Sequence, residues 1–511
     1  MNKIYLLVDC DLDGYLSASM AYIYIKKINP HIEIIPLFHN ENPKAHGLQD
    51  DEILDFLKSE IPSVLFITDA GSSDCNECKI LSELGWCIYI ADHHLCTENN
   101  PYATIVNNQS SNNVENKDLC GCGVTWKVLA KIDELNSTNY TKDLISYVHI
   151  ANIADSCLFI NAEQHTFRYW GLQNIHKNLL PFFNAFNYNQ NFDNMAFSFG
   201  MISKINAVIR VGNIQDKRKI FKSLCGEFNY NEAIEICNKC YQEQSKQRDS
   251  LLEQNIYLVN DKNIMLYKID IKTPLTGLIA NKLMSEYQKP VMILHDRENG
   301  EVSGSVRSPL ELQPILEKSN LFNYNKGHLC SFGTSYQKDK EQDIINYINQ
   351  LQLHEPCIDV LKSYSIKDIP YNLFELFDPS TDVLWGNGIS KPMFEIHDII
   401  YYPADVKILG DNKRTLKITY ISEIQDINIL IFNATKQNKI DLGLGYLDDK
   451  GNFIDFELNE FPAKKILNVV GTIGINKYIG RYGKIYINNQ IIVDKFETKV
   501  YNMIRKEDLF K

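Results

Sequence analysis

Short apolar segments alternate with amphipathic segments over the first hundred residues of the chain. Apolar runs bounded by polar residues are typical of buried strands, and apolar residues at three- and four-residue spacing are typical of helices. The pattern predicts strands at 4–9, 32–38, 64–69 and 87–92, and helices at 15–27, 51–59 and 74–84 between them. Because strands and helices alternate, we expect an α/β fold with a doubly wound, mostly parallel sheet.

The pattern changes further along the chain. A helical period without proline predicts a connecting helix over 216–256, and a second, smaller α/β pattern follows over 257–365. Over 366–511 short strands and turns replace long helices, which predicts a small β-barrel. The pattern therefore predicts a first α/β domain over 1–215, the connecting helix, a second α/β domain and a C-terminal barrel.

Composition narrows the class of protein. A hydrophobic content of 44% over 511 residues is typical of a globular protein with several cores and excludes a disordered chain. The net charge of -12 argues against a surface coated with basic residues for duplex DNA, although basic residues outnumber acidic ones over 463–506. The 13 cysteines are scattered and odd in number, which indicates reduced thiols. We find no apolar run long enough for a bilayer, so we expect a cytoplasmic protein without a membrane partner.

Carboxylates follow three of the four predicted strands. Asp9, Asp69 and Asp92 each end an apolar run, and Asp9 opens an alternating D-x-D-x-D stretch. Solvated turn residues would explain any one of them, because aspartate is a common turn former. Ligands of such sheets bind beyond the carboxyl ends of the strands, however, and carboxylates brought together there can hold a hard divalent cation. The adjacent histidines His93 and His94 favour the metal site, since imidazole beside carboxylates suits Mn²⁺.

Several motifs, taken together, resemble the DHH phosphoesterase superfamily and, within it, the RecJ-like single-strand-specific exonucleases. The catalytic motifs are "DCDLDG", "ITDAG", "ADHH" and "NIADS", and the supporting segments are "LCGCGVTWKVLAKI" and "FGMISKINAVIR". Further along, "GSVRSP" and "NKGHLCSFG" are similar to the DHH-associated domain. The stretches "LWGNGISKPMFEI" and "INKYIGRYGKIYINNQII" resemble the entry and closing strands of a RecJ OB fold. The resemblance thus implies a DHH domain, a substrate domain and an OB fold.

The resemblance also implies roles for individual residues. The implied ligands of two Mn²⁺ or Mg²⁺ ions are Asp9, Asp11, Asp13, Asp69, His93 and Asp155, with Asp9 either a ligand or the residue that orients one. Asp92 would hold a neighbouring histidine in place, and His94 would face the scissile phosphate. The implied substrate-binding residues are Asn206, Arg210, Ser305, Arg307, Gly327, His328, Tyr478 and Arg481.

The sequence departs from the family pattern in the loop after the second strand. The family has an arginine there that grips a 5′ phosphate, whereas this chain offers only His39 and Lys44, neither of which forms a bidentate fork. Lys326 also replaces the first glycine of the family's G-G-H motif. The first departure leaves the direction of any exonuclease action open.

Three functions remain in competition. The first is a metal-dependent 5′→3′ exonuclease that releases mononucleotides from single-stranded DNA in repair, recombination or replication, as a monomer with a helicase or single-strand-binding protein as partner. The second is a DHH phosphodiesterase for short RNA oligomers or small nucleotides. The third is a non-catalytic DHH scaffold that binds strands. A dead relative should lose ligands, and here the implied ligand set is complete.

Overall fold

The computed structural model describes residues 3–39, 46–96, 99–110, 114–187, 194–254, 256–270, 275–353, 359–378, 384–386, 388–410, 413–457, 461–462, 464–479 and 484–500. The chain divides into two compact units, Met1–Lys246 with Ser380–Ser390, and Gln247–Pro379 with Lys391–Lys511. The finer division into four segments stays a prediction. Within the described residues, no helix has both the length and the hydrophobicity needed to cross a bilayer.

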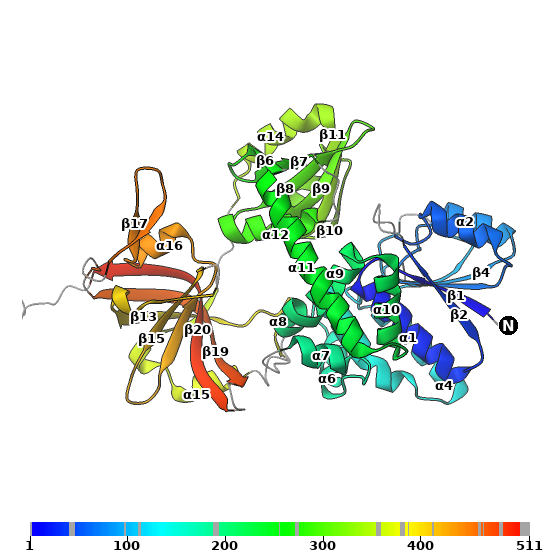
Figure 1. Ribbon diagram of the computed structural model, residues 1–511, viewed down its shortest axis with the longest axis horizontal. Helices are drawn as coiled ribbons and strands as arrows, with labels where there is room; N and C mark the ends of the chain where they lie inside the picture. Colours follow the sequence, from blue (N-terminus) through cyan, green and yellow to red (C-terminus); the bar gives the residue numbers. More distant parts are fainter. Residues whose placement is uncertain are drawn as a thin grey trace, which may run out of the picture. The chain divides into compact units, whose positions relative to one another are not determined.

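The first unit contains a five-stranded parallel sheet in the order β2-β1-β3-β4-β5 (Figure 1). This confirms the predicted α/β fold with a parallel sheet. Its strands are β1 (Lys3–Val8), β2 (Glu33–Phe38), β3 (Val64–Thr68), β4 (Cys87–Asp92) and β5 (Thr104–Asn107). The pattern missed β5, because it has only four residues and pairs on one side only.

Helices cover both faces of this sheet. Side chains alternate along β1, so that Leu6 and Val8 enter one apolar core while Tyr5 and Leu7 enter another. The first core is closed by α1 (Leu12–Ile28), α4 (Gly121–Asn136), α5 (Ile145–Ala154), α6 (Ala162–Gln173), α7 (Leu180–Phe186), α9 (Ser203–Val211) and α10 (Ile214–Cys225). The second is closed by α2 (Asp51–Ser59) and α3 (Cys75–Glu83). The unit also contains α8 (Asn194–Phe197).

The predicted connecting helix is wrong in one respect, because it is two helices. The first, α10, ends at Gly226, which adopts a left-handed conformation with φ of 85°. Glycine takes this conformation without the steric cost that a side chain would add. The second, α11 (Tyr230–Gln254), continues the polar helical pattern.

The second unit holds two larger sheets. One has the order β10-β11-β9-β8-β7-β6 and is built from β6 (Ile256–Asn260), β7 (Met265–Ile269), α12 (Thr276–Tyr287), β8 (Val291–Asp296), β9 (Glu301–Arg307), α13 (Gln313–Glu317), β10 (Tyr324–His328), β11 (Ser331–Gln337) and α14 (Glu341–Gln350). This is the smaller α/β pattern that the sequence predicts.

The other sheet has seven strands in the order β12-β13-β19-β20-β16-β15-β14. Its segment comprises β12 (Val360–Ser365), α15 (Tyr371–Glu375), β13 (Met393–Tyr401), β14 (Lys407–Leu409), β15 (Thr415–Tyr420), β16 (Ile427–Ile431), α16 (Lys436–Asp441), β17 (Gly445–Leu447), β18 (Phe453–Asp455), β19 (Lys465–Ile479) and β20 (Ile485–Val500). The described part of this segment is rich in strands, as predicted, and its α-helices α15 and α16 are short.

Candidate metal centre

Strand register brings three carboxylates into line at one edge of the parallel sheet. Thr68 of β3 pairs with Val8 of β1 on one side and with Ala91 of β4 on the other. The residues that follow these three are Asp9, Asp69 and Asp92, and each is only 1% exposed. The chain leaves β1 toward β2 on one side and returns to β3 on the other, and ligands bind at such reversals of strand order.

The turn after β1 adds two more carboxylates. Asp11 caps α1 by accepting a hydrogen bond from the Gly14 N–H at 3.1 Å, so the helix begins earlier than the pattern predicts. Asp13 therefore lies in the first helical turn, where it is buried. Its carboxylate accepts hydrogen bonds from the Gly121 and Cys122 N–H groups at 2.7 and 2.9 Å. The N-terminus of α4 thus fixes the carboxylate of Asp13.

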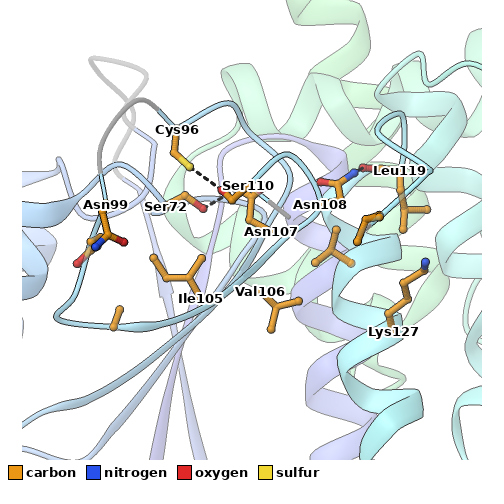
Figure 2. Close-up of a pocket in the computed structure, with 14 residues that line it drawn as sticks. Ser72, Cys96, Asn99, Ile105, Val106, Asn107, Asn108, Ser110, Leu119 and Lys127 are labelled. Carbon is orange, nitrogen blue, oxygen red and sulfur yellow. Dashed lines mark hydrogen bonds between the residues drawn. The ribbon is translucent and has the colours of Figure 1, made fainter. Parts of the chain in front are cut away.

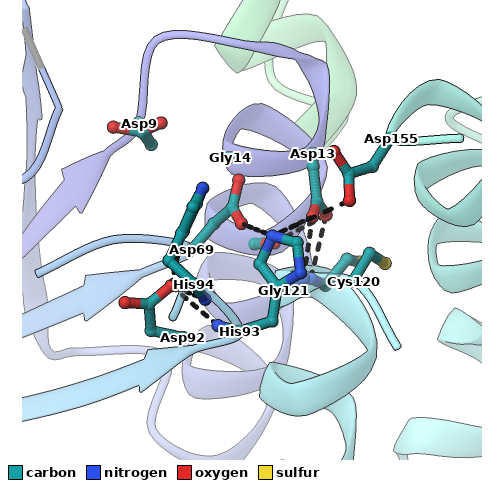
Figure 3. Close-up of polar contacts among 12 residues, drawn as sticks. Asp9, Asp13, Gly14, Asp69, Asp92, His93, His94, Cys120, Gly121 and Asp155 are labelled. Atoms are coloured by element: carbon teal, nitrogen blue, oxygen red, sulfur yellow. Dashed lines mark hydrogen bonds and ion pairs between the residues drawn. The ribbon is translucent and has the colours of Figure 1, made fainter. Parts of the chain in front are cut away.

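His93 lies among three of these acidic side chains (Figure 3). Its Nε2 atom is 3.2 Å from Asp69 Oδ1. The same nitrogen is 3.9 Å from Asp13 Oδ2 and 3.8 Å from Asp155 Oδ2, at the C-terminal end of α5. Ligand atoms of Asp13, His93 and Asp155 lie within 4.8 Å of one another, as do those of Asp9, Asp11 and Asp69. The structure therefore places all six predicted ligands in two adjoining clusters.

Asp69 lies in an environment where an ionised carboxylate without a counter-charge is energetically unfavourable. Burial, followed by the charges of neighbouring aspartates, holds the pKa of Asp69 well above its usual range. Its backbone has a positive φ of 66°, and its buried Oδ1 atom accepts no hydrogen bond from the described residues. A side chain at Gly121 would not fit, because its Cβ would lie 2.2 Å from that oxygen. A strained backbone and a buried carboxyl group that is costly to ionise without a counter-charge are features of a site that takes a cation.

Asp13 has a related property that makes the stability of the protein depend on pH. Burial raises the pKa of Asp13 to about 6, with His93 opposing the shift and Asp155 adding to it. A carboxyl group with a higher pKa in the folded state binds its proton more tightly there. Its contribution is fully present below the ordinary pKa of 3.8 and is lost as the pH rises through about 6.

We therefore expect the free energy of unfolding of the metal-free protein to fall, relative to that of an Asp13→Asn variant, as the pH rises from 3.8 to about 6. Urea unfolding of both proteins at a series of pH values in chelator measures the difference. If the free energy of unfolding of the wild-type protein rose relative to that of Asp13→Asn over this pH range, the assigned sign would be contradicted. Saturating Mn²⁺ should remove the slope, because a bound cation compensates the carboxylate.

Asp92 holds the ring of His94 and contacts only the backbone of His93. Its Oδ1 atom accepts hydrogen bonds from His94 Nδ1 at 2.8 Å and from the His93 N–H at 2.7 Å. Burial alone would raise the pKa of Asp92, but the hydrogen bond and charge of His94 hold it below its usual range. Burial likewise opposes protonation of His94, yet Asp92 raises the pKa of His94 to about 9. His94 is thus a cation at neutral pH, with half of its side chain exposed.

An Asp92→Asn substitution should lower the pKa of His94 from about 9 toward its ordinary value of 6.5, because the carboxylate is what holds the proton. Histidine NMR resonances followed over a pH titration measure this value. An unchanged pKa of His94 would show that Asp92 does not set its charge.

Two further predicted residues lie on α9. Burial lowers the pKa of Arg210, and the charges of Asp11 and Cys10 oppose that shift, which places the guanidinium near the turn after β1. Asn206 has a buried Oδ1 atom without a hydrogen-bond partner in the described part of the chain.

The remaining predicted substrate residues belong to the second unit. Ser305 and Arg307 lie on β9, while Gly327 and His328 lie on β10. Ser305 Oγ is 2.8 Å from Thr276 Oγ1 at the start of α12. Tyr478 lies near the end of β19, and Arg481 is outside the described residues.

Sequence reasoning missed His46 and named His39 as one stand-in for the phosphate-gripping arginine of the family. His39 is buried, with its ring nitrogens 3.7 Å from Asp9 and 3.2 Å from Asp50, so it does not reach out to a phosphate. His46 Nδ1 lies 2.8 Å from Asp9 Oδ2. Hydrogen bonds to Asp9 and Cys10 overcome burial and raise the pKa of His46 to about 11. The only sequence signal was a histidine before Gly-Leu; Lys44, the other proposed cation, is outside the described residues.

A cavity of about 780 Å³ is lined by residues of β5 and by Cys96, which follows His93 and His94 closely in the chain (Figure 2). Asn107 lines this cavity, and it pairs with Asp92 across the parallel strands β5 and β4. The Asn107 amide donates hydrogen bonds to Ser72 Oγ at 2.8 Å and to the His94 carbonyl at 2.9 Å. Because Ser72 in turn donates its N–H to Asp92, this wall of the cavity supports the Asp92–His94 pair.

Comparison with known proteins shows what this chain is similar to. Residues 3–152 match the model of the DHH family, N-terminal domain. A protein of Bacillus subtilis (strain 168) that bears the name SPbeta prophage-derived single-strand DNA-specific exonuclease YorK is 28% identical over 524 residues, covering 94% of this chain and 85% of its own. The single-stranded-DNA-specific exonuclease RecJ of Haemophilus influenzae is 23% identical and covers 82% of this chain and 78% of its own.

Solved structures agree with this class at the level of the fold. RecJ from Thermus thermophilus in complex with Mn²⁺ superposes with a TM-score of 0.69 at 15% identity, over 98% of this chain and 69% of that one. The same protein in complex with Mg²⁺ gives a TM-score of 0.61 at 14% identity, over 98% and 68% of the two chains. The protein contains a DHH domain. Over most of its length the chain is also similar to RecJ-like single-strand-specific exonucleases.

Proposed function

We propose that the protein is a divalent-metal-dependent exonuclease that hydrolyses phosphodiester bonds of single-stranded DNA. The observation that carries this proposal is the meeting of Asp13, Asp69, His93 and Asp155 at one edge of the sheet, next to Asp9 and Asp11. These residues come from four separate segments of the chain, which follow β1, β3, β4 and α5. The names of the curated relatives support single-stranded DNA as the substrate.

The residues present fit a pair of hard cations. Five carboxylates and one imidazole form two adjoining clusters. The buried Asp69 Oδ1 atom accepts no hydrogen bond within the described residues. Oxygen-rich sets of this kind suit Mn²⁺ or Mg²⁺, the ions present in the two RecJ structures. Bound ions would supply a nucleophilic water at neutral pH and neutralise charge on the phosphate.

The chain's own residues would then position and balance the phosphate. His94 is a half-exposed cation whose Nδ1 is engaged by Asp92, so its ring can donate from Nε2 to a phosphate oxygen or to the leaving group. Arg210 lies near Asp11 and offers a planar fork suited to phosphate. Asn206, whose Oδ1 atom has no hydrogen-bond partner among the described residues, would be a further polar contact for the nucleotide.

In the second unit, Ser305 and Arg307 would hold another phosphate at the N-terminus of α12. A Cβ at Gly277 would lie 2.7 Å from the Arg307 guanidinium, so glycine permits the arginine to lie against the helix start. Helix N-termini favour anions, and arginine adds a charged fork. Gly327 and His328 on the edge strand β10 would contact the same strand of nucleotides.

The seven-stranded sheet would serve as an OB-fold module that holds single-stranded DNA. Such modules bind strands through a basic groove and stacking aromatic rings, for which Tyr478 and Arg481 are the proposed contacts. The direction of digestion is proposed as 5′→3′ with release of mononucleotides. We also propose that the protein acts as a monomer in repair, recombination or replication, with a helicase or a single-strand-binding protein as its partner.

One assay tests the activity directly. The purified full-length protein is incubated with Mn²⁺ and with end-labelled single strands, matched duplexes and dinucleotides. We expect mononucleotides from single strands only, lost with EDTA and appearing first from the 5′ end.

The other outcomes each point elsewhere. Products from the 3′ end would reverse the proposed direction and leave hydrolysis standing. Cleavage confined to dinucleotides would favour a phosphodiesterase for short oligomers. Strand binding without cleavage, unchanged in an Asp69→Asn variant, would favour a scaffold and overturn the nuclease.

A further inference from the structure

Three different kinds of ligand atom meet beside the carboxylate clusters, at the end of β1. His46 Nδ1 is 2.8 Å from Asp9 Oδ2. The sulfur of Cys10 is 3.5 Å from His46 Nδ1 and 3.7 Å from its Nε2. One ligand atom from each of Asp9, Cys10 and His46 lies within 4.8 Å of the other two. A carboxylate, a thiol and an imidazole therefore converge on one point.

The backbone fixes His46 in this position. The next residue, Gly47, has a positive φ of 60° and donates its N–H to Asp9 Oδ1 at 3.3 Å. A Cβ at Gly47 would lie 2.1 Å from Asp74 Oδ2, the atom that accepts the Leu48 N–H at 2.7 Å. The segment is thus clamped between Asp9 and Asp74. The His46 side chain is 46% exposed, so an ion can reach the cluster.

The donor types and the spacing of Cys10 and His46 match a tetrahedral ion with borderline-soft preferences, whereas the 2.8 Å between His46 Nδ1 and Asp9 Oδ2 is a hydrogen-bond distance. That distance must lengthen to about 3.3 Å when an ion replaces the shared proton. Zinc bonds of about 2.3 Å to sulfur and about 2.0 Å to nitrogen place the two ligand atoms about 3.5 Å apart in a tetrahedron. The observed separation of Cys10 Sγ and His46 Nδ1 is the same. Sulfur is absent from the two clusters assigned to the hydrolytic centre, whose oxygen-rich ligands favour harder ions.

We propose that Asp9, Cys10 and His46 form a separate cation site that selects a borderline-soft divalent ion, Zn²⁺ or Co²⁺. The site shares Asp9 with the hydrolytic centre. An ion bound here would therefore share the Asp9 carboxylate with that centre. The site itself is defined by this triad and does not depend on what the neighbouring centre hydrolyses.

Cobalt spectroscopy tests the proposal without an activity assay. Co²⁺ is added to the metal-free full-length protein, and the near-ultraviolet thiolate-to-cobalt charge-transfer band is recorded. We expect a band that saturates, disappears on addition of Zn²⁺, and is absent in Cys10→Ser. We expect His46→Asn to shift the midpoint of the band to at least about 10-fold higher Co²⁺. Cys87→Ser is the matched control, because Cys87 is a free, exposed cysteine at the start of β4, and it should keep the band.

No band in the wild-type protein, or a band that survives in Cys10→Ser, would overturn the site. Cys10→Ala is measured alongside, and thermal melts verify that each variant is folded. Cleavage of single-stranded DNA with Mn²⁺ is assayed on the same wild-type preparation. Cleavage without a cobalt band would reject the proposed cation site and leave the nuclease standing. A cobalt band without cleavage would reject the proposed nuclease and leave the cation site standing.

Discussion

An Asp69→Asn variant should lose at least about 1,000-fold in Mn²⁺-dependent cleavage of single-stranded DNA while remaining folded. Asp69 is the carboxylate that adjoins both clusters, within 3.2 Å of His93 and in the group formed with Asp9 and Asp11. Asparagine keeps the shape and removes the charge that a cation would neutralise. Because burial and the neighbouring aspartates raise the pKa of Asp69, removing its charge should not lower the melting temperature in EDTA.

The same variant should lose stabilisation by metal. An ion that binds only the folded state at 100 times its dissociation constant adds about 2.7 kcal/mol to the free energy of unfolding. We expect Mn²⁺ to raise the melting temperature of the wild-type protein and to leave that of Asp69→Asn nearly unchanged. Turnover and melting curves, each with Mn²⁺ or EDTA, measure both effects.

Asp74→Asn provides the matched control. Asp74 is also a buried aspartate of the first unit, but it accepts hydrogen bonds from the Leu48 N–H and the Gln49 amide at 2.7 and 2.9 Å. Its substitution should cost stability equally with and without Mn²⁺ and should preserve the Mn²⁺-induced rise in melting temperature. Wild-type turnover by Asp69→Asn would reject the assigned centre.

A Gly121→Ala variant should be impaired in both stability and cleavage. An added Cβ would lie 2.2 Å from Asp69 Oδ1 and 2.7 Å from Asp69 Cα, so either β3 or α4 must move. Overpacking of this kind costs about 1–3 kcal/mol. The Gly121 N–H also binds Asp13 at 2.7 Å, so the shift displaces ligands of both clusters. We expect a loss of about 100-fold in cleavage, as misplacement by an ångström commonly produces.

Urea unfolding and single-turnover cleavage measure the two effects of Gly121→Ala. Gly474→Ala in β19 is the control, because the nearest atom that its added Cβ would meet among the described residues, apart from its chain neighbours, is 3.7 Å away, which is ordinary van der Waals contact. Its free energy of unfolding should change by less than that of Gly121→Ala. If Gly121→Ala matched the wild-type protein in stability and turnover, the close approach of α4 to Asp69 would be refuted.

The local pattern of apolar and polar residues predicted much of the secondary structure of the first unit. Apolar runs located β1 to β4, and the residues after β1 and β3, together with the last residue of β4, are the carboxylates that line the edge of the sheet. This worked because a buried strand needs a continuous apolar run whatever it pairs with. The pattern failed at β5, which is short, and at Gly226, where one positive φ divides a polar helical stretch into α10 and α11.

By itself the sequence determined that carboxylates and histidines end the strands of a parallel sheet, and its motifs pointed to the DHH superfamily. Only the tertiary structure decided which groups meet: that α4 donates its first N–H groups to Asp13, that Asp92 holds the ring of His94, and that His46 reaches Asp9 and Cys10. The physical reason is that periodicity reports on which face of an element is buried. Contacts between segments far apart in the chain depend on register and packing, which no local pattern contains.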